Sequence, residues 1–437
     1  MKQSCVAILG AYTEFSELYV RHLCSEGHHV ALLDLDPKKA QQLKDYAQKN
    51  PKHFTNLDVS FHTLDEANIF DSLIAKFAEI KASYNLAGLL NIKEKLVIEG
   101  AKAAEVLGLP GTGIKAATVS RNKYLQRALF ADSSFAPQSK IFQLSDALQN
   151  LPERGVLKPI NEHGSVGVVL WRSSEQISSV KEALKDFSPQ ALFLLEELIE
   201  GNEYSLEAWI SQSKVVTHHV TRKGTLPAEN IEFPVENSHE IFAEDSLEEK
   251  TKEQLSVILN RIISQTHVQN AILHLEFKVS ASGVKIMEWC VRNPGDRIMD
   301  LYYYSQAFNP YALYADICTG KTNFKVQKHQ KRTKQIYFSA RESLNSLDPT
   351  HPLCYWPTHS KYIGFVRGKN GETLSAEEIV VHELGVLLKE EDLTKAPIIR
   401  DSFSRHAYVI LSYPPKTEPS NDGILIEKSI KGMSLCS

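Results

Sequence analysis

The sequence predicts an α/β protein in which a parallel, Rossmann-like layer is followed by a region of antiparallel strand pairs. Near the N-terminus, short apolar runs alternate with helical segments, which is the pattern of a parallel sheet. From about residue 138 onward, apolar runs come in pairs separated by short polar turns, which indicates antiparallel strands. A chain of 437 residues is long enough for about three domains and a substantial core.

The composition is that of an ordinary globular protein, with 43% hydrophobic and 23% charged residues. The net charge of −4 gives no reason to expect a nucleic acid or a membrane as partner. Six cysteines are scattered without a CxxC pair, which is typical of free thiols in a reducing compartment. The first apolar run is too short for a signal peptide, and no run approaches a membrane span. We therefore expect a cytoplasmic protein.

The N-terminal layer is predicted from three strands. "SCVAILG" and "HHVALLDLD" each read as a buried strand followed by a helix, the second helix opened by Pro37. A further strand near 86–91 leads into another helix. The first turn, "GAYTEF", lacks the GxGxxG pattern, so Asp34 or Asp36 after the second strand is only weak support for a dinucleotide. The layer is better interpreted as a scaffold, and a nicotinamide-dependent dehydrogenase is the least favoured function.

The later part of the chain is predicted from its strand pairs and two helices. "GVLKPI" and "VGVVLWR" flank the loop "NEHGS", and "ALFLLEELI" and "EYSLEAWI" flank "EGN". Helices are expected at 246–266 and at about 297–319, the second ended by Gly320. The basic run 325–335 is expected to be a solvated connector. Beyond it, 336–437 reads as short strands of a small α+β appendage.

Two strand-like segments, "HLEFKV" and "KIMEWCVR", have a two-residue rhythm. It places His274, Glu276 and Lys278 on one face of the first segment, and Glu288, Cys290 and Arg292 on one face of the second. If residues 281–283 form a three-residue loop between them, Glu276 lies directly opposite Glu288, with side-chain bases about 5 Å apart. Two facing carboxylates repel each other, and a divalent cation between them would turn that repulsion into coordination. The sequence therefore predicts a magnesium site on this hairpin.

The same hairpin face carries His274, Cys290 and Arg292, whereas the opposite face is nearly all apolar. Arg292 offers a planar fork that suits a phosphate group. The competing interpretation is an exposed strand pair whose acids face water and Lys278. The register of the hairpin decides between the two.

Two further segments carry features of a phosphate and nucleotide site. Lys158 ends an apolar strand before a loop that contains Gly164, Ser165 and Gly167. Loop glycines let backbone N–H groups approach phosphate oxygens, and the lysine adds a point charge. Many β-hairpins carry such a loop, and this one is not a Walker motif. Glu203, just after a tight turn, is a candidate for the ribose, although a solvated turn is the commoner explanation.

In this order, "RNKYLQRALF", "VLKPINEHGSVGV", "LLEELIEGNEYSLE" and "HLEF…KIMEWCVRNPGDR" resemble the ATP-grasp superfamily over residues 85–320. "GLPGTGIKAATVSRNK" and "RNPGDR" are most similar to its amino-acid ligase branch, whose members join a carboxylate to an amine and release ADP and phosphate. The resemblance implies an ATP-grasp fold with an N-terminal Rossmann-like domain and a central module of two α+β subdomains. The expected boundaries are 1–95 for the Rossmann-like domain, 96–124 for linker helices, 125–190 for the lid, 191–325 for the catalytic subdomain and 326–437 for the C-terminal α+β subdomain.

The resemblance also implies the ligands. ATP would bind with Mg²⁺, or Mn²⁺ as an alternative ion, and Glu276 and Glu288 would hold the metal. Arg292 would steady the transferring phosphoryl group or the tetrahedral intermediate. The positions expected at the nucleotide are Lys123, Lys158, His163, Gly164, Ser165, Val166, Gly167, Glu196, Glu197, Leu198, Ile199 and Glu203. The two lysines would face the phosphates, the strand end 196–199 the adenine, and the final glutamate the ribose.

Amino acids are the expected substrates, and their site is less sharply defined. His274 is the candidate base for the attacking amine, or else a histidine bonded to a carboxylate that shapes the pocket. Cys290 stands where many family members have an asparagine ligand; a thiol is a poor partner for magnesium, so a small filler is the simpler interpretation. Weaker substrate candidates are Glu94, His239, Gly295 and Asp296.

The favoured function is a carboxylate–amine ligase that makes a dipeptide or similar amide through an acyl phosphate. A close rival passes the acyl group to the thiol of a carrier protein. A more distant rival is a nucleotide-binding protein without turnover. Whether the protein is a homodimer is left open.

Overall fold

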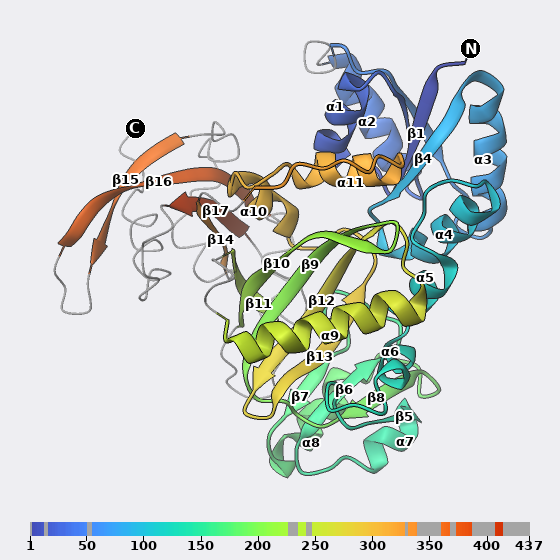
Figure 1. The fold of residues 1–437 in the computed structure, drawn as a ribbon. Helices are drawn as coiled ribbons and strands as arrows, with labels where there is room; N and C mark the ends of the chain where they lie inside the picture. The colour runs from blue at the N-terminus through green and yellow to red at the C-terminus, as the bar shows by residue number, and fades with distance from the viewer. Residues whose placement is uncertain are drawn as a thin grey trace.

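The computed structural model describes residues 2–12, 16–49, 55–225, 235–241, 247–327, 331–338, 360–367, 373–386 and 407–413. Within these ranges three β-sheets follow one another in space, with the N-terminal layer at one end and a small sheet at the other (Figure 1). The largest sheet lies between them and continues toward the C-terminal strands.

The N-terminal layer is a four-stranded parallel sheet with the order β3-β2-β1-β4. Its elements are β1 (Ser4–Leu9), α1 (Ser16–Ser25), β2 (His29–Asp34), α2 (Pro37–Lys49), β3 (Val59–Thr63), α3 (Ile69–Ser83) and β4 (Asn85–Asn91). All of β2 and nearly all of β1 are buried, as expected for strands covered on both faces. The three predicted strands are confirmed, whereas β3 and α3 were not predicted.

Short helices connect this layer to the rest of the molecule: η1 (Glu94–Leu96), α4 (Val97–Val106), α5 (Ile114–Ser120) and α6 (Lys123–Leu129). Asn122 caps α6, since its side-chain oxygen accepts a hydrogen bond from the Leu125 N–H at 3.1 Å. This cap fixes where α6 starts, and α6 packs against the hairpin of the central sheet.

The small sheet has the antiparallel order β5-β8-β6-β7 and a core of its own around Trp171 and Phe193. Its elements are β5 (Ser139–Gln143), α7 (Leu144–Gln149), β6 (Gly155–Pro159), β7 (Val169–Trp171), η2 (Ser174–Gln176), α8 (Ile177–Ala183) and β8 (Leu192–Glu196). The predicted β6–β7 pair is confirmed. The pairing expected around "EGN" is wrong, because β8 ends in this sheet and the next strand begins in the central one.

The central sheet has the antiparallel order β13-β12-β9-β10-β11-β14-β17-β16-β15. Its strands are β9 (Asn202–Ser211), β10 (Lys214–Thr225), β11 (Glu236–Ile241), β12 (Ala271–Ser280), β13 (Gly283–Cys290), β14 (Arg332–Phe338), β15 (Ser360–Arg367), β16 (Thr373–Val386) and β17 (Ala407–Tyr413). Helix α9 (Glu249–Thr266), which the sequence predicted, lies along one face (Figure 1). Its Leu255, Ile258 and Ile262 share one core with the apolar face of the β12–β13 hairpin.

Two predictions for the later part of the chain need correction. The helix expected at 297–319 is two helices, α10 (Ile298–Tyr304) and α11 (Pro310–Cys318). The break lies at Asn309, whose side chain caps α11, and Pro310 cannot continue a preceding helix. The basic run is not a connector throughout: β14 starts at Arg332 within it. The described C-terminal strands β14–β17 extend the central sheet.

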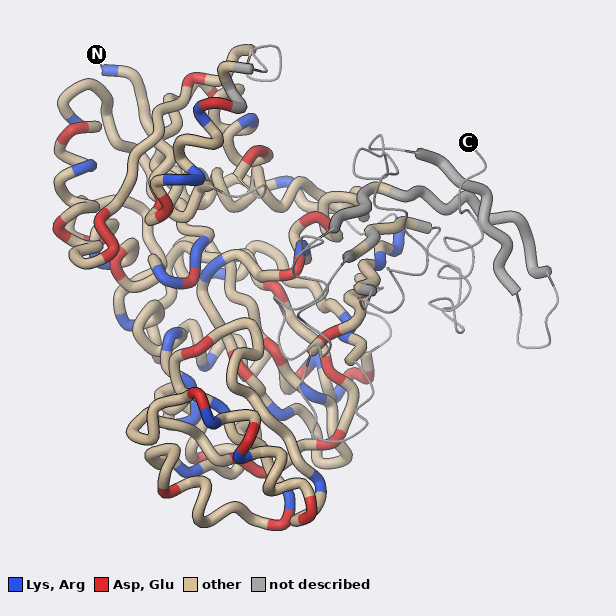
Figure 2. Tube along the Cα trace, turned by 180° about the vertical axis from the view of Figure 1, so that it is seen from behind, with Lys and Arg blue, Asp and Glu red and all other residues tan. Residues whose placement is uncertain are grey.

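Charges of both signs alternate along the described trace, with Lys and Arg interspersed among Asp and Glu (Figure 2). This agrees with the small net charge of −4. Among the residues that the structure describes, we find no helix that is both long and apolar enough to span a bilayer.

Candidate active site

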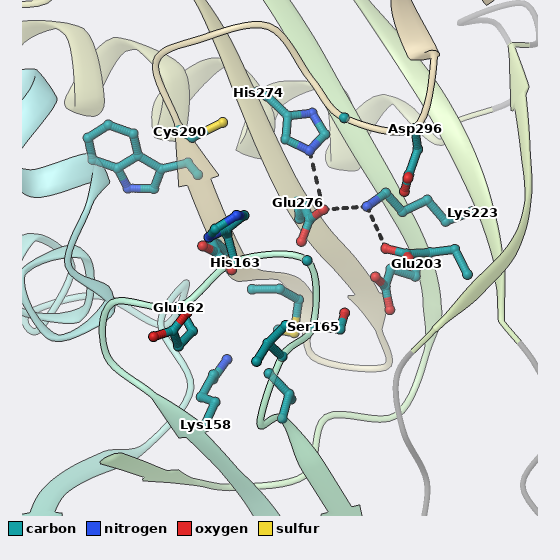
Figure 3. A pocket seen from close by; sticks show the side chains of 18 of the residues that line it. Lys158, Glu162, His163, Ser165, Glu203, Lys223, His274, Glu276, Cys290 and Asp296 are labelled. Atoms are coloured by element: carbon teal, nitrogen blue, oxygen red, sulfur yellow. Dashed lines mark hydrogen bonds and ion pairs between the residues drawn. The ribbon is translucent and has the colours of Figure 1, made fainter. Parts of the chain in front are cut away.

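A cavity of about 680 Å³ lies between the small sheet and the central sheet (Figure 3). Its lining includes most residues proposed from the sequence: Glu94, Lys123, Lys158, His163, Gly164, Ser165, Val166, Glu196, Glu197, Leu198, Ile199, Glu203, His274, Glu276, Glu288, Arg292, Gly295 and Asp296. Two proposed residues, Gly167 and His239, are not among those that line it. Six separate segments of the chain thus meet at one place.

The β12–β13 hairpin places Glu276 directly opposite Glu288, as predicted. The loop assumed for that prediction is wrong, because Ser280 pairs with Gly283 and only residues 281–282 form the turn. A β-bulge restores the register: Phe277 pairs with Ile286, so that Met287 is the extra residue. The turn and the bulge together bring the two carboxylates face to face.

Each of these carboxylates is paired with a lysine. Lys123 Nζ lies 3.0 Å from Glu288 Oε1, and Lys223 of β10 contacts Glu276 and also lies 3.1 Å from Glu236. The side chains of Glu276 and Glu288 are 24% and 29% exposed, toward the cavity. Two adjacent carboxylates that stay accessible while cations balance them fit a divalent ion with oxygen ligands.

His274 lies between two carboxylates. Its Nδ1 is 2.8 Å from Glu207 Oε1 and its Nε2 is 3.2 Å from Glu276 Oε1 (Figure 3). Burial opposes the charged imidazole, but the two hydrogen bonds prevail and raise the pKa of His274 to about 9. Glu207 is held in turn by Ser205, Thr221 and Tyr302. Both ring nitrogens are therefore bonded to carboxylates of the protein, which favours the pocket-shaping interpretation over the catalytic base.

Lys158 belongs to a buried ionic trio. Its Nζ lies 2.5 Å from Glu196 Oε2, and Arg127 Nε lies 2.5 Å from Glu196 Oε1. Burial favours the neutral acid, but the two cations lower the pKa of Glu196 to about 2. The trio joins the small sheet to α6, and it leaves Lys158 at the cavity wall.

The loop between β6 and β7 approaches the cavity with unusual backbone angles. Gly164 and Ser165 have φ values of +62° and +61°, and Gly167 has +70°. A Cβ at Gly167 would lie 2.5 Å from the Phe187 ring, so this position requires glycine. A loop of this kind can present backbone N–H groups to an anion.

Arg292 and Glu94 are bound to each other, and Arg121 binds the same carboxylate. Burial favours the neutral acid, but the guanidinium groups of Arg292 and Arg121 lower the pKa of Glu94 to about 2. Glu94 is therefore already neutralised twice. This argues against Glu94, one of the weaker substrate candidates, as a group that binds the ammonium of an amino acid, and makes it an anchor for Arg292 beside the cavity.

Cys290 is buried and faces the cavity side of β13. Burial raises the pKa of its thiol to about 12. A neutral thiol is neither a nucleophile nor a ligand for a hard cation. The geometry therefore favours the interpretation of Cys290 as a small filler.

His239, Asp296 and Glu236 lie close together, and the last two line the cavity. Their ligand atoms lie within 4.8 Å of one another, and His239 Nε2 is 3.9 Å from Asp296 Oδ2. Gly295 precedes Asp296, and the space around its Cα is open. Asp296 points from its loop toward Lys223 (Figure 3). The three substrate candidates of the later chain are thus neighbours.

The nucleotide-edge candidates lie where β8 crosses to β9. Glu197 exchanges hydrogen bonds with Gln138, and Leu198 and Ile199 line the cavity. Glu203 Oε2 lies 3.6 Å from Lys278 Nζ, and burial raises the pKa of this acid. Backbone groups and one polar acid therefore edge this side of the cavity.

Asp34 in the N-terminal layer is engaged within the layer. Its carboxylate accepts hydrogen bonds from the backbone N–H groups of Tyr12 at 3.1 Å and Leu35 at 2.6 Å, and it pairs with Lys93. These internal contacts account for the acid at the strand end. They give no support to a nicotinamide dehydrogenase.

Sequence reasoning missed five residues that complete the site: Gln126, Arg127, Glu207, Lys223 and Glu236. Two of them carried a readable signal, because Gln126 and Arg127 follow Lys123 by three and four positions and share its helix face. Lys223 and Glu207 meet the hairpin only through strand pairings distant in sequence.

Comparison with known proteins places this geometry in context. Residues 151–299 match the family of the ATP-grasp domain. Two relatives from Bacillus subtilis, both named alanine–anticapsin ligase, are 26% identical over 236 residues and 25% identical over 279 residues. The first alignment covers 48% of this chain and 48% of the relative, and the second covers 57% of each. The chain thus spans about half the length of the curated relatives it matches.

Solved structures resemble nearly the whole chain. The L-amino acid ligase from Bacillus licheniformis has a TM-score of 0.67 at 16% identity, over 99% of this chain and 98% of that one. N5-carboxyaminoimidazole synthetase from Staphylococcus aureus, complexed with ADP, has a TM-score of 0.65 at 10% identity, over 98% and 96%. At such identities the likeness shows the fold. The family match is to residues 151–299, which carry the ATP-grasp domain.

Proposed function

We propose that this protein is an ATP-dependent ligase that joins the carboxylate of one amino acid to the amine of a second and releases ADP and phosphate. One observation carries the proposal: Glu276 and Glu288 pair in register at a cavity that Lys123, Lys158 and Arg292 also line. A pair of acids beside three cations suits a metal-bound triphosphate next to an anionic substrate.

Glu276 and Glu288 would hold Mg²⁺, which would act as a Lewis acid on the phosphate oxygens when bound. Lys123, which now balances Glu288, and Lys158 would then face the phosphates. The loop from His163 to Val168 would cover the triphosphate with its backbone N–H groups. The strand end 196–199 would edge the adenine, and Glu203 would accept hydrogen bonds from the ribose.

The chemistry we propose has two steps. A substrate carboxylate oxygen attacks the γ-phosphorus of ATP, the bond to the β-phosphate oxygen breaks, and an acyl phosphate and ADP result. The amine of the second substrate then attacks the acyl carbon, and inorganic phosphate leaves with the bonding electron pair. Both reactants of the first step are anionic, so the positive charge of Lys123, Lys158 and Arg292 would lower its barrier.

An acyl phosphate would be lost to hydrolysis in open water, so the site must close. The small sheet carries both Lys158 and the glycine loop, and closing it over the central sheet would seal the cavity. Holding the amine beside the acyl group replaces concentration by proximity.

The relatives support this branch of chemistry. Two matched proteins are named alanine–anticapsin ligase, and a structure of the same fold is an L-amino acid ligase. The first name describes a ligase that joins alanine to anticapsin, and the second a ligase that acts on L-amino acids. The joining of an amino acid to an amine fits the charges that line the cavity described above. The amino acids used by this chain are left to experiment.

The test is a screen of phosphate release from ATP and Mg²⁺ with amino acids added singly and in pairs. We expect release that requires two partners, with a dipeptide or amide identified by mass spectrometry. Release with one amino acid and a carrier protein, with the acyl group on its thiol, would favour the carrier rival. ATP binding without release in any mixture would favour the non-catalytic rival.

A variant ties the screen to the hairpin. Glu288→Gln should lower phosphate release by at least about 100-fold, because even residues that only support a metal ligand cost about 10–100-fold when changed. Circular dichroism should show that the variant is folded. Near-normal turnover in a folded Glu288→Gln protein would show that the metal assignment is wrong.

A further inference from the structure

β13 is the edge strand of the central sheet, so one row of its backbone groups has no neighbouring strand. The segment 126–135 supplies the missing partners. The Ile286 N–H donates to the Phe135 carbonyl at 2.8 Å. Gln126 holds both backbone groups of Trp289: its Oε1 accepts from the N–H at 3.0 Å and its Nε2 donates to the carbonyl at 2.9 Å. The edge beside Glu288 is therefore closed by side chains of a helix.

The same helix also satisfies the bulge. Met287 is the extra residue on β13, and Arg127 Nη2 donates to its carbonyl at 2.6 Å. Without the bulge, the tight turn at 281–282 would place Glu276 opposite Met287 and turn Glu288 off register. The position of Glu288 thus depends on a local irregularity that needs external partners.

The three contacts come from one face of α6. Lys123, Gln126 and Arg127 stand at positions i, i+3 and i+4 and are all buried. In turn they contact the carboxylate of Glu288, the backbone of Trp289 and the backbone of Met287. One face of α6 therefore binds three successive residues of the hairpin.

We propose that Gln126 and Arg127 are positioning residues for Glu288. They hold the backbone on both sides of this acid and so set where its carboxylate meets a divalent ion. This inference rests on the proposed metal site. Arg127 also pairs with Glu196, which holds Lys158. One guanidinium thus ties the metal acid to the lysine that faces the phosphates.

The test measures metal binding directly, with Mn²⁺ as the probe in the presence of the non-hydrolysable nucleotide AMP-PNP. The paramagnetic resonance signal of free aqueous Mn²⁺ reports the bound fraction. Gln126→Met keeps the side-chain volume but removes both hydrogen bonds to Trp289. We expect it to weaken Mn²⁺ binding by about 10–100-fold, the range for residues that support a metal ligand.

Leu129→Ala is the matched control, because Leu129 lies on the same helix and is a partly buried apolar side chain that packs against the core shared by α9 and the β12–β13 hairpin. It should lower stability but leave the Mn²⁺ dissociation constant within about twofold of the wild-type value, since the site geometry is unchanged. Arg127→Lys is the second variant. It keeps the charge beside Glu196 and shortens the donor to Met287, and it should weaken Mn²⁺ binding by about tenfold.

The outcomes separate this inference from the proposed function. A folded Gln126→Met or Arg127→Lys protein that binds Mn²⁺ as tightly as the wild type would overturn the positioning role. So would equal weakening by Leu129→Ala, which would reduce the effect to general destabilisation. If the wild type binds Mn²⁺ with AMP-PNP, the variants lose it, and no amino acid pair releases phosphate, the positioning role stands and the ligase proposal fails.

Discussion

Two lysine–glutamate pairs lie at the same cavity, yet their surroundings differ. Lys158 and Glu196 have side chains that are 8% and 2% exposed, and Arg127 completes a closed trio. Lys123 and Glu288 are 5% and 29% exposed, so that this carboxylate keeps an open side toward the cavity. The first acid is fully engaged within the protein, and the second can accept a further cation.

The difference shows how the two kinds of buried charge are used. Desolvating an acid is costly, and Glu196 offsets that cost by its ion pairs with Arg127 and Lys158. Glu288 stays partly hydrated and has one lysine in the place where a divalent ion would bring more charge. We therefore assign Glu196 to the framework of the site and Glu288 to its chemistry. Substituting each of these two acids, or protonating Glu196 by lowering the pH, tests this assignment.

The largest expected effect is on folding stability. Glu196→Gln leaves Lys158 and Arg127 buried without a counter-charge, which should lower the free energy of unfolding by about 3–5 kcal/mol. Glu288→Gln removes a carboxylate that is 29% exposed from a buried lysine, and should lower it by less, about 1–2 kcal/mol. Urea denaturation of the two variants beside the wild type measures both values. Equal losses would erase the distinction between the two pairs.

Acid should reveal the same trio in the unmodified protein. Glu196 has an ordinary pKa of 4.5 that the fold lowers to about 2. A lowered folded pKa means that its stabilisation is complete above pH 4.5 and is lost as the pH falls toward 2. The loss from this group should be about 3 kcal/mol, at about 1.4 kcal/mol per pKa unit.

Urea denaturation at a series of pH values from 6 down to 3 should show the free energy of unfolding falling with pH. Glu196→Gln serves as the control. Because Glu94 also has a pKa lowered to about 2, both proteins will lose some stability in acid for a reason that does not involve Glu196. The quantity to follow against pH is therefore the difference in the free energy of unfolding between the wild type and Glu196→Gln. A difference that stays constant with pH would contradict the assignment.

Local patterns predicted the parts of the site that depend on local rules. The alternation in "HLEFKV" and "KIMEWC" identified which hairpin face is polar, since side chains alternate along a strand. The predicted pairing of Glu276 with Glu288 was correct although its loop was not. A three-residue loop and a two-residue turn followed by a bulge shift the register equally, so two structures give the same pairing.

Contacts between segments that are distant in the chain could not be predicted from the sequence. Lys223 reaches Glu276 only because β10 and β12 both pair with β9, and no local pattern specifies that order. The place of β14 in the central sheet was missed for a similar reason, because its charged residues resemble a solvated run. By contrast, the break before α11 was readable, since Asn309 followed by Pro310 is a helix start signal.

The smallest expected effect concerns Cys290. It lies on the same strand as Glu288 and lines the same cavity, but we expect no part for it in the chemistry. Burial keeps its thiol neutral, with a pKa of about 12, and sulfur is a poor ligand for magnesium. Cys290→Ala should therefore leave phosphate release within about threefold of the wild-type rate and cost about 1 kcal/mol of stability through lost packing. A magnesium titration of phosphate release would check this. If half-saturation required tenfold more magnesium in Cys290→Ala than in the wild type, the thiol would belong with Glu288 as part of the metal site, and the filler interpretation would be wrong.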